Sequence, residues 1–443
     1  MTGAELMALF VRVFRADRVD ELARRYGLVE RQRALDVIGF VVSLILSGGT
    51  HDGGRQYDVL RTYLENGARR VTRGAFYSWF NEPLEGLLMT LLADAIAEGA
   101  AVPSILPGIL AGVSDWRIVD STTIKLDKAL LSEWPGTGDY AAGKIHKEWS
   151  VGRGNLVTFH LSPAREHDNP HLTVDEARRG TGLLVDLGYA SFDLLRRCKA
   201  HDVRYVIRLK ESWKPRVDRI VRGALPADIL KTGDLDILLG DHVLLRDGHA
   251  IDADVTVGRG ESAVASRLVG VPTPKGYCFF LTNVPRRTHG PLQIGDIYRA
   301  RWEIELDNKV DKTGARIDEI TARKPTSVRI LLLASLLNTT LARIIVQREK
   351  ASILAAKADP SDPAKKPPLH ATQVVRAMRV SHSAVLAVLS GVVPDKFEWN
   401  RIMGNIRSLG HDPNWRRRPS VLDVIQGLTA PPDRRRASKK ASS

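Results

Sequence analysis

The sequence predicts an α/β protein. Its expected core is a mixed β-sheet interrupted by a mostly β insertion, preceded by an all-α N-terminal domain and followed by a small helical C-terminal segment. Apolar residues follow helical spacing up to about residue 105, short β-branched runs separated by turns begin near residue 113, and helical spacing returns beyond about residue 370. The 443 residues are enough for two or three domains with a large buried core.

The charge balance favours a polyanionic partner. Lys and Arg number 65 against 51 Asp and Glu, a net charge of +14. Cys198 and Cys278 lie far apart in sequence, so no disulfide framework or CxxC zinc site is expected, which fits a reducing cytoplasm. No signal peptide is expected, because the N-terminus carries an early acid and lacks a basic start and a small-residue cleavage site. No membrane partner is expected, because no lipidation motif or basic amphipathic anchor stands out, Val37–Leu46 is too short to span a bilayer and polar residues interrupt Val328–Val346.

Residues 1–112 read as an N-terminal helical DNA-binding domain. Two helices, Tyr57–Leu64 and Thr72–Phe80, are expected to flank a tight connection, with Thr72 as a helix N-cap. This pair suits a helix-turn-helix that contacts DNA and equally a basic hairpin with no DNA contact, so both interpretations stay open. The side chains that suggest DNA contact are Arg61, Arg69, Arg70, Arg73, Tyr77 and Trp79.

The segment 113–210 has the pattern of the first part of an α/β core. Asp120 lies inside an apolar strand, where Asp is disfavoured, and Asp186 ends a buried strand. A parallel β-α-β unit with a right-handed crossover is expected in the second half. The expected strands are Trp116–Leu126, Lys144–Val151, Leu156–Leu161, Leu183–Asp186 and Arg204–Leu209, and the expected helices are Pro170–Arg179 and Phe192–Ala200, the latter capped by Ser191.

The rest of the chain divides by composition. Residues 211–290 read as a β-rich insertion, 291–350 as the second part of the core with a helix at Arg323–Val346, 351–369 as a linker, 370–430 as a helical segment and 431–443 as a basic disordered tail. The apolar runs expected within the insertion are Ile237–Leu239, Val243–Leu245, Ala253–Val257 and Tyr277–Leu281.

The stretch Tyr298–Lys312 (YRARWEIELDNKVDK) carries the most functional side chains. Read as one helix with about 100° per residue, it gathers five of them on one face: Tyr298, Arg301, Glu305, Lys309 and Lys312. A carboxylate among cations and a tyrosine suits an anionic ligand held beside a metal. The alternative is a surface helix with ion pairs at i,i+4 spacing.

The spacing of four of these residues resembles that of one family. Tyr, two residues, Arg, three residues, Glu, six residues and Lys is the pattern of the DDE transposases of bacterial cut-and-paste insertion sequences, in the branch named for its Tyr-Arg-Glu-Lys helix. The resemblance, strong over about residues 113–346, implies an RNase H-like core. It implies that Asp120, Asp186 and Glu305 are the first, second and third catalytic acids.

The resemblance also implies a two-metal site. The three acids would bind two Mg²⁺ ions, for which Mn²⁺ can substitute, and such ions activate an oxygen nucleophile and stabilise a leaving oxygen. Arg301 and Lys312 would bind phosphate, and Tyr298 and Lys309 would contact DNA. Trp213, at the start of the insertion, would either stack on a flipped base or be an ordinary core residue.

The expected function is that of a transposase acting on double-stranded DNA beside the nucleoid. It would bind the terminal inverted repeats of its element, cleave DNA to free a 3′-OH and join that end to target DNA. The resemblance adds a hairpin intermediate and a synaptic homodimer. The alternatives are a Mg²⁺-dependent nuclease without joining activity and a non-catalytic DNA-binding regulator. Asp307 and Asn308 depart from the family pattern, which often has aromatic residues after the catalytic Glu, so the packing there stays open.

Overall fold

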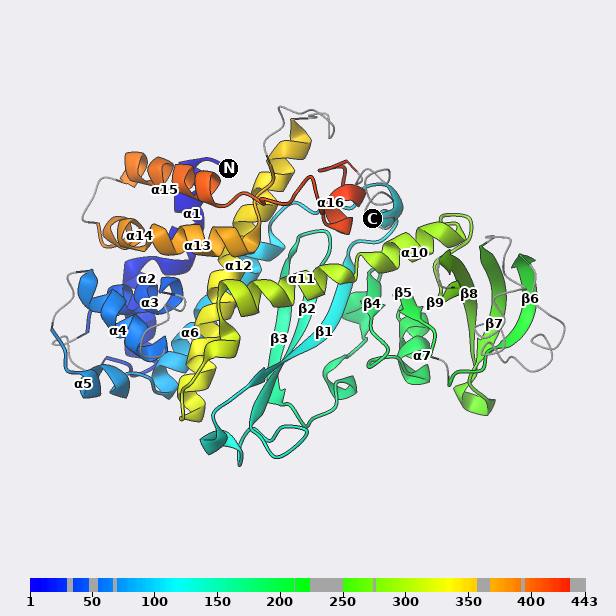
Figure 1. Ribbon diagram of the computed structural model, residues 1–443, viewed down its shortest axis with the longest axis horizontal. Coiled ribbons are helices and arrows are strands. Elements are labelled where there is room, and N and C mark those ends of the chain that lie inside the picture. Colours follow the sequence, from blue (N-terminus) through cyan, green and yellow to red (C-terminus); the bar gives the residue numbers. More distant parts are fainter. Residues whose placement is uncertain are drawn as a thin grey trace, which may run out of the picture.

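The computed structural model describes residues 1–29, 35–47, 55–66, 70–210, 212–223, 250–273, 276–356, 367–391 and 395–430. The predicted runs Ile237–Leu239 and Val243–Leu245, the predicted DNA contact Arg69, most of the predicted linker and the tail 431–443 lie outside these residues. A β-sheet runs through the molecule, and helices from both ends of the chain gather around one long helix beside it (Figure 1).

The sheet is mixed and has the order of an RNase H-like core at its centre. Within the described residues its order is β3-β2-β1-β4-β5-β9-β8-β7-β6. β2 is antiparallel to β1 and β3, whereas β1, β4 and β5 are parallel. The strands are β1 Trp116–Lys125, β2 Ala142–Ser150, β3 Asn155–Pro163, β4 Gly182–Val185, β5 Arg204–Arg208, β6 Arg216–Arg222, β7 Ile251–Val257, β8 Val264–Thr273 and β9 Gly276–Thr282.

Most predicted core elements are confirmed, and local chemistry explains them. β4 is buried along its whole length, as its unbroken apolar run indicates. The Ser191 side chain accepts a hydrogen bond of 3.1 Å from the Leu194 amide and so begins α7, Phe192–Ala200. β2 and β3 form the predicted hairpin, and Gly154 between them has a φ of 56°, a conformation that favours glycine.

The predicted helix Pro170–Arg179 is wrong. The structure has only two short 3₁₀ turns there, Asn169–His171 and Glu176–Arg178. Between them Leu172 and Val174 are both buried. Burial at i and i+2 is the period of extended chain, so packing of these two side chains outweighs the weak helical preference of so short a segment.

The strands of the predicted insertion extend the core sheet. β9 pairs antiparallel with β5, and β8, β7 and β6 follow outward. β7 and β9 confirm the runs Ala253–Val257 and Tyr277–Leu281. β8 was not predicted because its pattern is broken by Arg267. The structure buries this side chain in an ion pair of 2.6 Å with Asp252 on β7.

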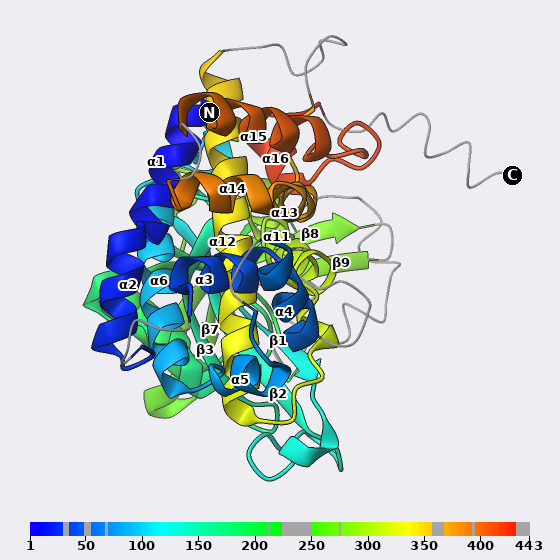
Figure 2. The same ribbon diagram turned by 90° about the vertical axis from the view of Figure 1, so that its left-hand side faces the viewer.

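Helices from the two ends of the chain share one hydrophobic core with α12. α12 runs beside both the blue N-terminal and the orange C-terminal helices (Figure 2). It runs from Pro325 to Ala355, so it begins later than predicted, with proline in its first turn, and takes in the start of the predicted linker. Its most apolar stretch is long enough to cross a membrane but is completely buried inside the protein, as in a core helix.

The other helices have the following bounds. They are α1 Gly3–Phe14, α2 Ala16–Arg25, α3 Val37–Leu46, α4 Arg55–Glu65, α5 Arg73–Ser78, α6 Glu82–Ala100, α10 Pro291–Arg299, α11 Trp302–Lys309, α13 Ala371–Val380, α14 His382–Leu389, α15 Asp395–Leu409 and α16 Val421–Ile425.

The stretch Tyr298–Lys312 is not one uniform helix. α10 ends at Arg299 and α11 begins at Trp302. Between them the chain forms a tighter turn, in which the Arg301 amide donates to the Tyr298 carbonyl at 2.9 Å in place of an i→i−4 hydrogen bond. After α11 the chain forms a π-helical turn, Val310–Gly314, that contains Lys312. The constant rotation of about 100° per residue assumed from the sequence therefore fails at both ends of α11.

Candidate active site

The two predicted catalytic aspartates lie at the same level on neighbouring strands. Asp120 is the fifth residue of β1, and Asp186 directly follows β4. β1 and β4 are parallel, and Val119 pairs with Val185 immediately before them. Neighbouring strands are about 4.8 Å apart, so the two carboxyl groups can share one site at the carboxyl end of β4, where α/β sheets usually bind ligands.

Glu305 approaches the same place from α11, which packs on β1. Burial raises the pKa of Asp120 to about 6, and the negative charges of Glu305 and Asp186 act in the same direction, against the opposing charge of Arg301. Each of the other two acids therefore lies within range of the charge on Asp120. We call Asp120, Asp186 and Glu305 the acidic triad.

The acidic triad suits a hard divalent cation. Its ligands are oxygens only, and a bound cation would offset both the burial and the mutual repulsion that raise the pKa of Asp120. Among the described residues, no three His, Cys, Asp or Glu side chains already lie close enough together to hold a metal ion. The triad is thus a group of acids that interact through their charges, and a cation would have to draw them closer.

Arg301 connects two of the other predicted residues. Its guanidinium lies 3.6 Å from the Glu305 carboxylate and 5.8 Å from the centre of the Tyr298 ring. Burial raises the pKa of Tyr298 to about 12, so its hydroxyl stays protonated and able to donate. Lys312 is half-buried in the π-helical turn, whereas Lys309 is exposed. The sequence predicted that all five residues share one helix face. That prediction describes Tyr298, Arg301 and Glu305 better than it describes Lys309 and Lys312.

Trp213 packs within the protein. Its ring lies 4.5 Å from that of Phe192 on α7, and the Lys210 ammonium is 5.7 Å from its centre. It is half-buried against the hydrophobic cluster on that side of the sheet. Only the solvent-exposed part of the Trp213 ring could stack on a base.

The N-terminal residues suggested for DNA contact also have partners inside the protein. Trp79 and Tyr77 pack in an aromatic cluster around Phe76, with ring centres 5.5 and 6.2 Å from it. The predicted N-cap is confirmed, since the Thr72 hydroxyl accepts from the Ala75 amide at 3.2 Å. Arg73 is exposed and lies over the Tyr77 ring at 5.2 Å. Both predicted helices are present, as α4 and α5, and ring contacts such as that of Tyr63 with Phe76 pack them together.

Sequence reasoning missed a group of four buried charges that holds α11. We call Lys147, Asp307, Asp311 and Arg343 the charge quartet. Lys147 on β2 donates to Asp307 at 2.6 Å and to Asp311 at 2.8 Å, and Arg343 on α12 pairs with both aspartates. All four side chains are almost fully buried. The i,i+4 spacing of Asp307 and Asp311 was the only trace of this group in the sequence.

Asn308 was also missed. Its side-chain amide donates to the Asp120 carboxylate at 3.1 Å. The sequence marked Asp307 and Asn308 only as departures from a family pattern. Their shared role in the structure is to fasten α11, on one side to the charge quartet and on the other to Asp120.

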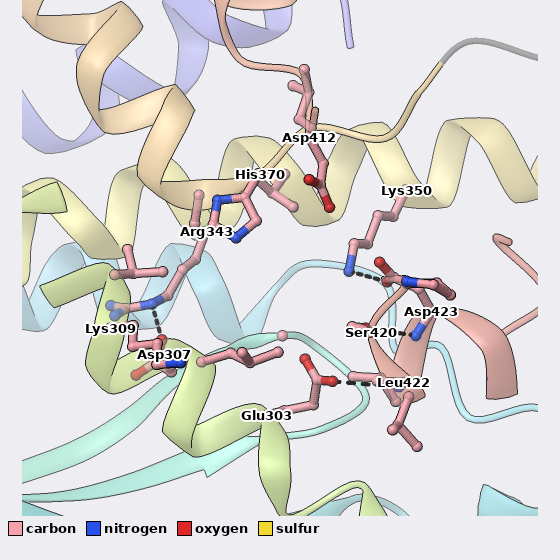
Figure 3. Close-up of a pocket in the computed structure, with 18 of the residues that line it drawn as sticks. Glu303, Asp307, Lys309, Arg343, Lys350, His370, Asp412, Ser420, Leu422 and Asp423 are labelled. Carbon is pink, nitrogen blue, oxygen red and sulfur yellow. Dashed lines mark hydrogen bonds and ion pairs between the residues drawn. The ribbon is translucent and has the colours of Figure 1, made fainter. Parts of the chain in front are cut away.

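A pocket of about 640 Å³ lies between α11, α12 and the C-terminal segment, and no member of the acidic triad lines it (Figure 3). Lys350 on α12 pairs with Asp423 at 2.5 Å, and the Glu303 carboxylate accepts from the Leu422 amide at 3.4 Å. Burial, aided by the charge of Asp423, raises the pKa of Glu303 to about 7. Exposed Lys309 also lines this pocket, whereas the other predicted DNA contacts on this stretch do not.

Comparison with known proteins adds family information to this geometry. The chain is 32% identical over 267 residues to the transposase for insertion sequence element IS231E of Bacillus thuringiensis subsp. finitimus, which covers 52% of this chain and 55% of that protein. It is 23% identical over 260 residues to the putative transposase InsL for insertion sequence element IS186A of Escherichia coli (strain K12), covering 52% of this chain and 66% of that protein. The chain thus spans only about half to two thirds of the length of these relatives.

One solved structure also aligns with this chain: the cryo-EM structure of the piggyBac transposase synaptic complex with hairpin DNA. The alignment covers 90% of this chain and 85% of that chain, at 10% sequence identity and a TM-score of 0.43. This structural likeness is weak. The family model described as the transposase DDE domain matches residues 112–341. This match takes in β1, β4 and α11, the elements that carry the acidic triad, and extends over more than half of the chain. The chain therefore belongs to the transposase DDE domain family.

Proposed function

We propose that this chain is a DNA transposase that acts on the terminal inverted repeats of an insertion sequence. It belongs, in this proposal, to the branch with the Tyr-Arg-Glu-Lys helix. The observation that supports the proposal is that Val119 and Val185, the residues before Asp120 and Asp186, pair on neighbouring strands, with α11 and its Glu305 packed on β1, in a member of the DDE family. Three acids from two strands and a helix that interact at one point are what metal-dependent phosphoryl transfer requires.

In this proposal the acidic triad holds two Mg²⁺ ions, or Mn²⁺ in their place. Bound there, the ions would supply an activated oxygen nucleophile and stabilise the leaving oxygen. Arg301 is placed to hold Glu305 by their ion pair of 3.6 Å and to donate to a phosphate of the bound strand. Lys312 and the protonated hydroxyl of Tyr298 add further phosphate contacts, and the uncovered part of Trp213 adds stacking on a base.

The partners follow from the same proposal. The +14 charge favours double-stranded DNA, first the ends of the element and then the target. Lys309 is exposed and lies one helical turn after Glu305 on α11, and in this proposal it also contacts DNA. We further propose that cutting proceeds through a hairpin, that two copies of the chain synapse on DNA, and that the protein works in the cytoplasm beside the nucleoid.

The experiment is cleavage and joining of DNA that carries the element's own ends, in the presence of Mg²⁺. Wild type is compared with Glu305→Gln, and with Asp296→Asn as the control, since Asp296 is a partly exposed acid on the preceding helix, α10. We expect wild type and the control to cut and join, and Glu305→Gln to bind the ends without cutting. Retained binding shows that the variant is folded.

Three results would overturn the proposal. Equal cutting by Glu305→Gln removes Glu305 from the site. Cutting without joining by the wild type identifies a nuclease. Specific binding of the ends without cutting by the wild type identifies a regulator.

A further inference from the structure

Asn308 makes a direct contact with the acidic triad. Its Nδ2 donates to Oδ2 of Asp120 at 3.1 Å, and the residue is only 7% exposed. The amide must face the carboxylate with its N–H₂ group, because two facing oxygens would repel. Of the two carboxylate oxygens of Asp120, one is therefore held by a side chain from another element of the fold.

Asn308 and Glu305 reach Asp120 together. They are three residues apart on α11, so they lie on the same face of this helix, one turn from each other. A shift of α11 along or away from β1 would move both side chains at once. The distance between Glu305 and Asp120 is therefore linked to the hydrogen bond that Asn308 makes.

The charge quartet prevents such a shift. Asp307, the residue before Asn308, is bound to Lys147 at 2.6 Å. Lys147 lies opposite Asp120 in the β1–β2 ladder. The quartet thus fastens α11 to the strand pair that carries Asp120, at the level where Asn308 makes its bond. A side chain held on a rigid element in this way can fix the rotamer of a ligand.

The second polar atom of Asn308 is unused. Its Oδ1 is buried and has no hydrogen-bond partner among the described residues. A buried acceptor without a partner is unfavourable, and such an atom in a ligand site usually has a partner when the site is occupied. Amide oxygens are ordinary ligands of hard divalent cations and accept hydrogen bonds from the waters that surround them.

We propose that Asn308 is a fourth member of the site, which positions Asp120 through Nδ2 and offers Oδ1 to the divalent cation or its water. This inference rests on the proposed function, since it takes the acidic triad as the cation site. Partner side chains of this kind typically change metal affinity or activity by about 10–100-fold when removed. A purely structural role, holding α11 to β1, would change stability alone.

Two substitutions separate the two atoms of the amide. Asn308→Leu removes both the donor and the acceptor, whereas Asn308→Asp is isosteric, loses the donor and keeps an oxygen at Oδ1. The control is Glu303→Gln, an isosteric change on the same helix. Glu303 is buried and lines the pocket between α11, α12 and the C-terminal segment. Two quantities are measured for each variant. Binding of Mn²⁺ is followed without DNA, from the EPR signal of the free ion. Cleavage of the element's ends is measured in a separate assay.

We expect Asn308→Leu to weaken Mn²⁺ binding and to reduce cleavage by about 10–100-fold each. Asn308→Asp should recover Mn²⁺ binding but not cleavage, because Asp120 is then no longer held. Mn²⁺ binding and cleavage at the wild-type level in Asn308→Leu would overturn the inference. So would equal losses in Glu303→Gln, which would show that any change in α11 has this effect.

The failure of this inference is distinct from failure of the proposed function. If wild type cleaves and Glu305→Gln does not, while Asn308→Leu behaves as wild type, only the role of Asn308 is wrong. If Glu305→Gln cleaves as well as wild type, the acidic triad itself is wrong.

Discussion

Replacing Lys147 with methionine should destabilise the protein by about 3–5 kcal/mol, because it leaves one buried charge uncompensated. The charge quartet is neutral, with two cations facing two carboxylates at 2.6–2.8 Å where Lys147 donates. Burial by itself lowers the pKa of Lys147, but the carboxylates of Asp307 and Asp311 outweigh it and raise that pKa above its usual value. Methionine keeps the volume of the stem and removes only the ammonium.

The double variant Lys147→Met/Asp307→Leu tests the cause. It removes one charge of each sign and leaves Arg343 paired with Asp311 at 2.7 Å, so the group is neutral again. Replacing a buried ion pair by apolar side chains is often close to neutral. We therefore expect the double variant to be more stable than Lys147→Met alone, although it carries one substitution more.

The assay is equilibrium unfolding in urea, followed by circular dichroism. An exposed pair is the control: Arg299 and Asp296 on α10 are 3.4 Å apart and largely solvent-exposed, so Arg299→Met should change the free energy of unfolding by less than about 1 kcal/mol. A loss below about 1 kcal/mol for Lys147→Met, or a double variant less stable than the single one, would refute the reasoning. Because Lys147 lies opposite Asp120, Lys147→Met should also reduce DNA cleavage.

Two further predictions concern stability. Burial, and after it the charge of His171, lowers the pKa of His146 to about 4, so the folded protein favours the neutral imidazole. The free energy of unfolding that depends on this neutral form is fully present above pH 6.5 and is lost as the pH falls towards 4. His146→Gln should therefore flatten the loss of stability over this range, by at most about 3 kcal/mol, and an unchanged pH profile in urea unfolding would contradict this. Gly182→Ala should destabilise by about 1–3 kcal/mol or more, since the added Cβ would lie 2.3 Å from the buried Trp116 ring. The control is Gly74→Ala, in an exposed helix, where an added Cβ meets nothing within 4 Å, so it should be neutral or slightly stabilising. Equal melting temperatures for the two variants would show that the protein relieves the contact between the added Cβ and Trp116.

The sequence predicted elements well where local chemistry decides them. β4 is an unbroken apolar run, and α7 begins at a serine whose hydroxyl accepts from the Leu194 amide. The places of Asp120 and Asp186, within and after strands, follow from the same patterns. The spacing of Tyr298, Arg301 and Glu305 pointed to α11, although the helix itself is shorter than expected.

Elements that depend on distant partners could not be predicted in this way. β8 contains Arg267, which looks like a break in an apolar pattern until its partner Asp252 on β7 is known. The segment 170–179 forms no α-helix, because Leu172 and Val174 between its two 3₁₀ turns are buried in a hydrophobic cluster with residues of β4 and α7. In both cases the pairing energy comes from residues that are not neighbours in sequence.

The sequence by itself determined the kinds of residue that could form a site and the elements that carry them. Strand and helix periods are local properties of the chain, so they placed Asp120, Asp186 and Glu305 on two strands and a helix, and the family resemblance singled out these three acids. Only the tertiary structure decided how these residues are held. Asn308 reaches Asp120, and Lys147 and Arg343 fasten α11, through buried contacts between residues 32 to 188 positions apart. Such contacts depend on which side chains meet after folding, when burial makes an unpaired charge costly and a paired one tolerable.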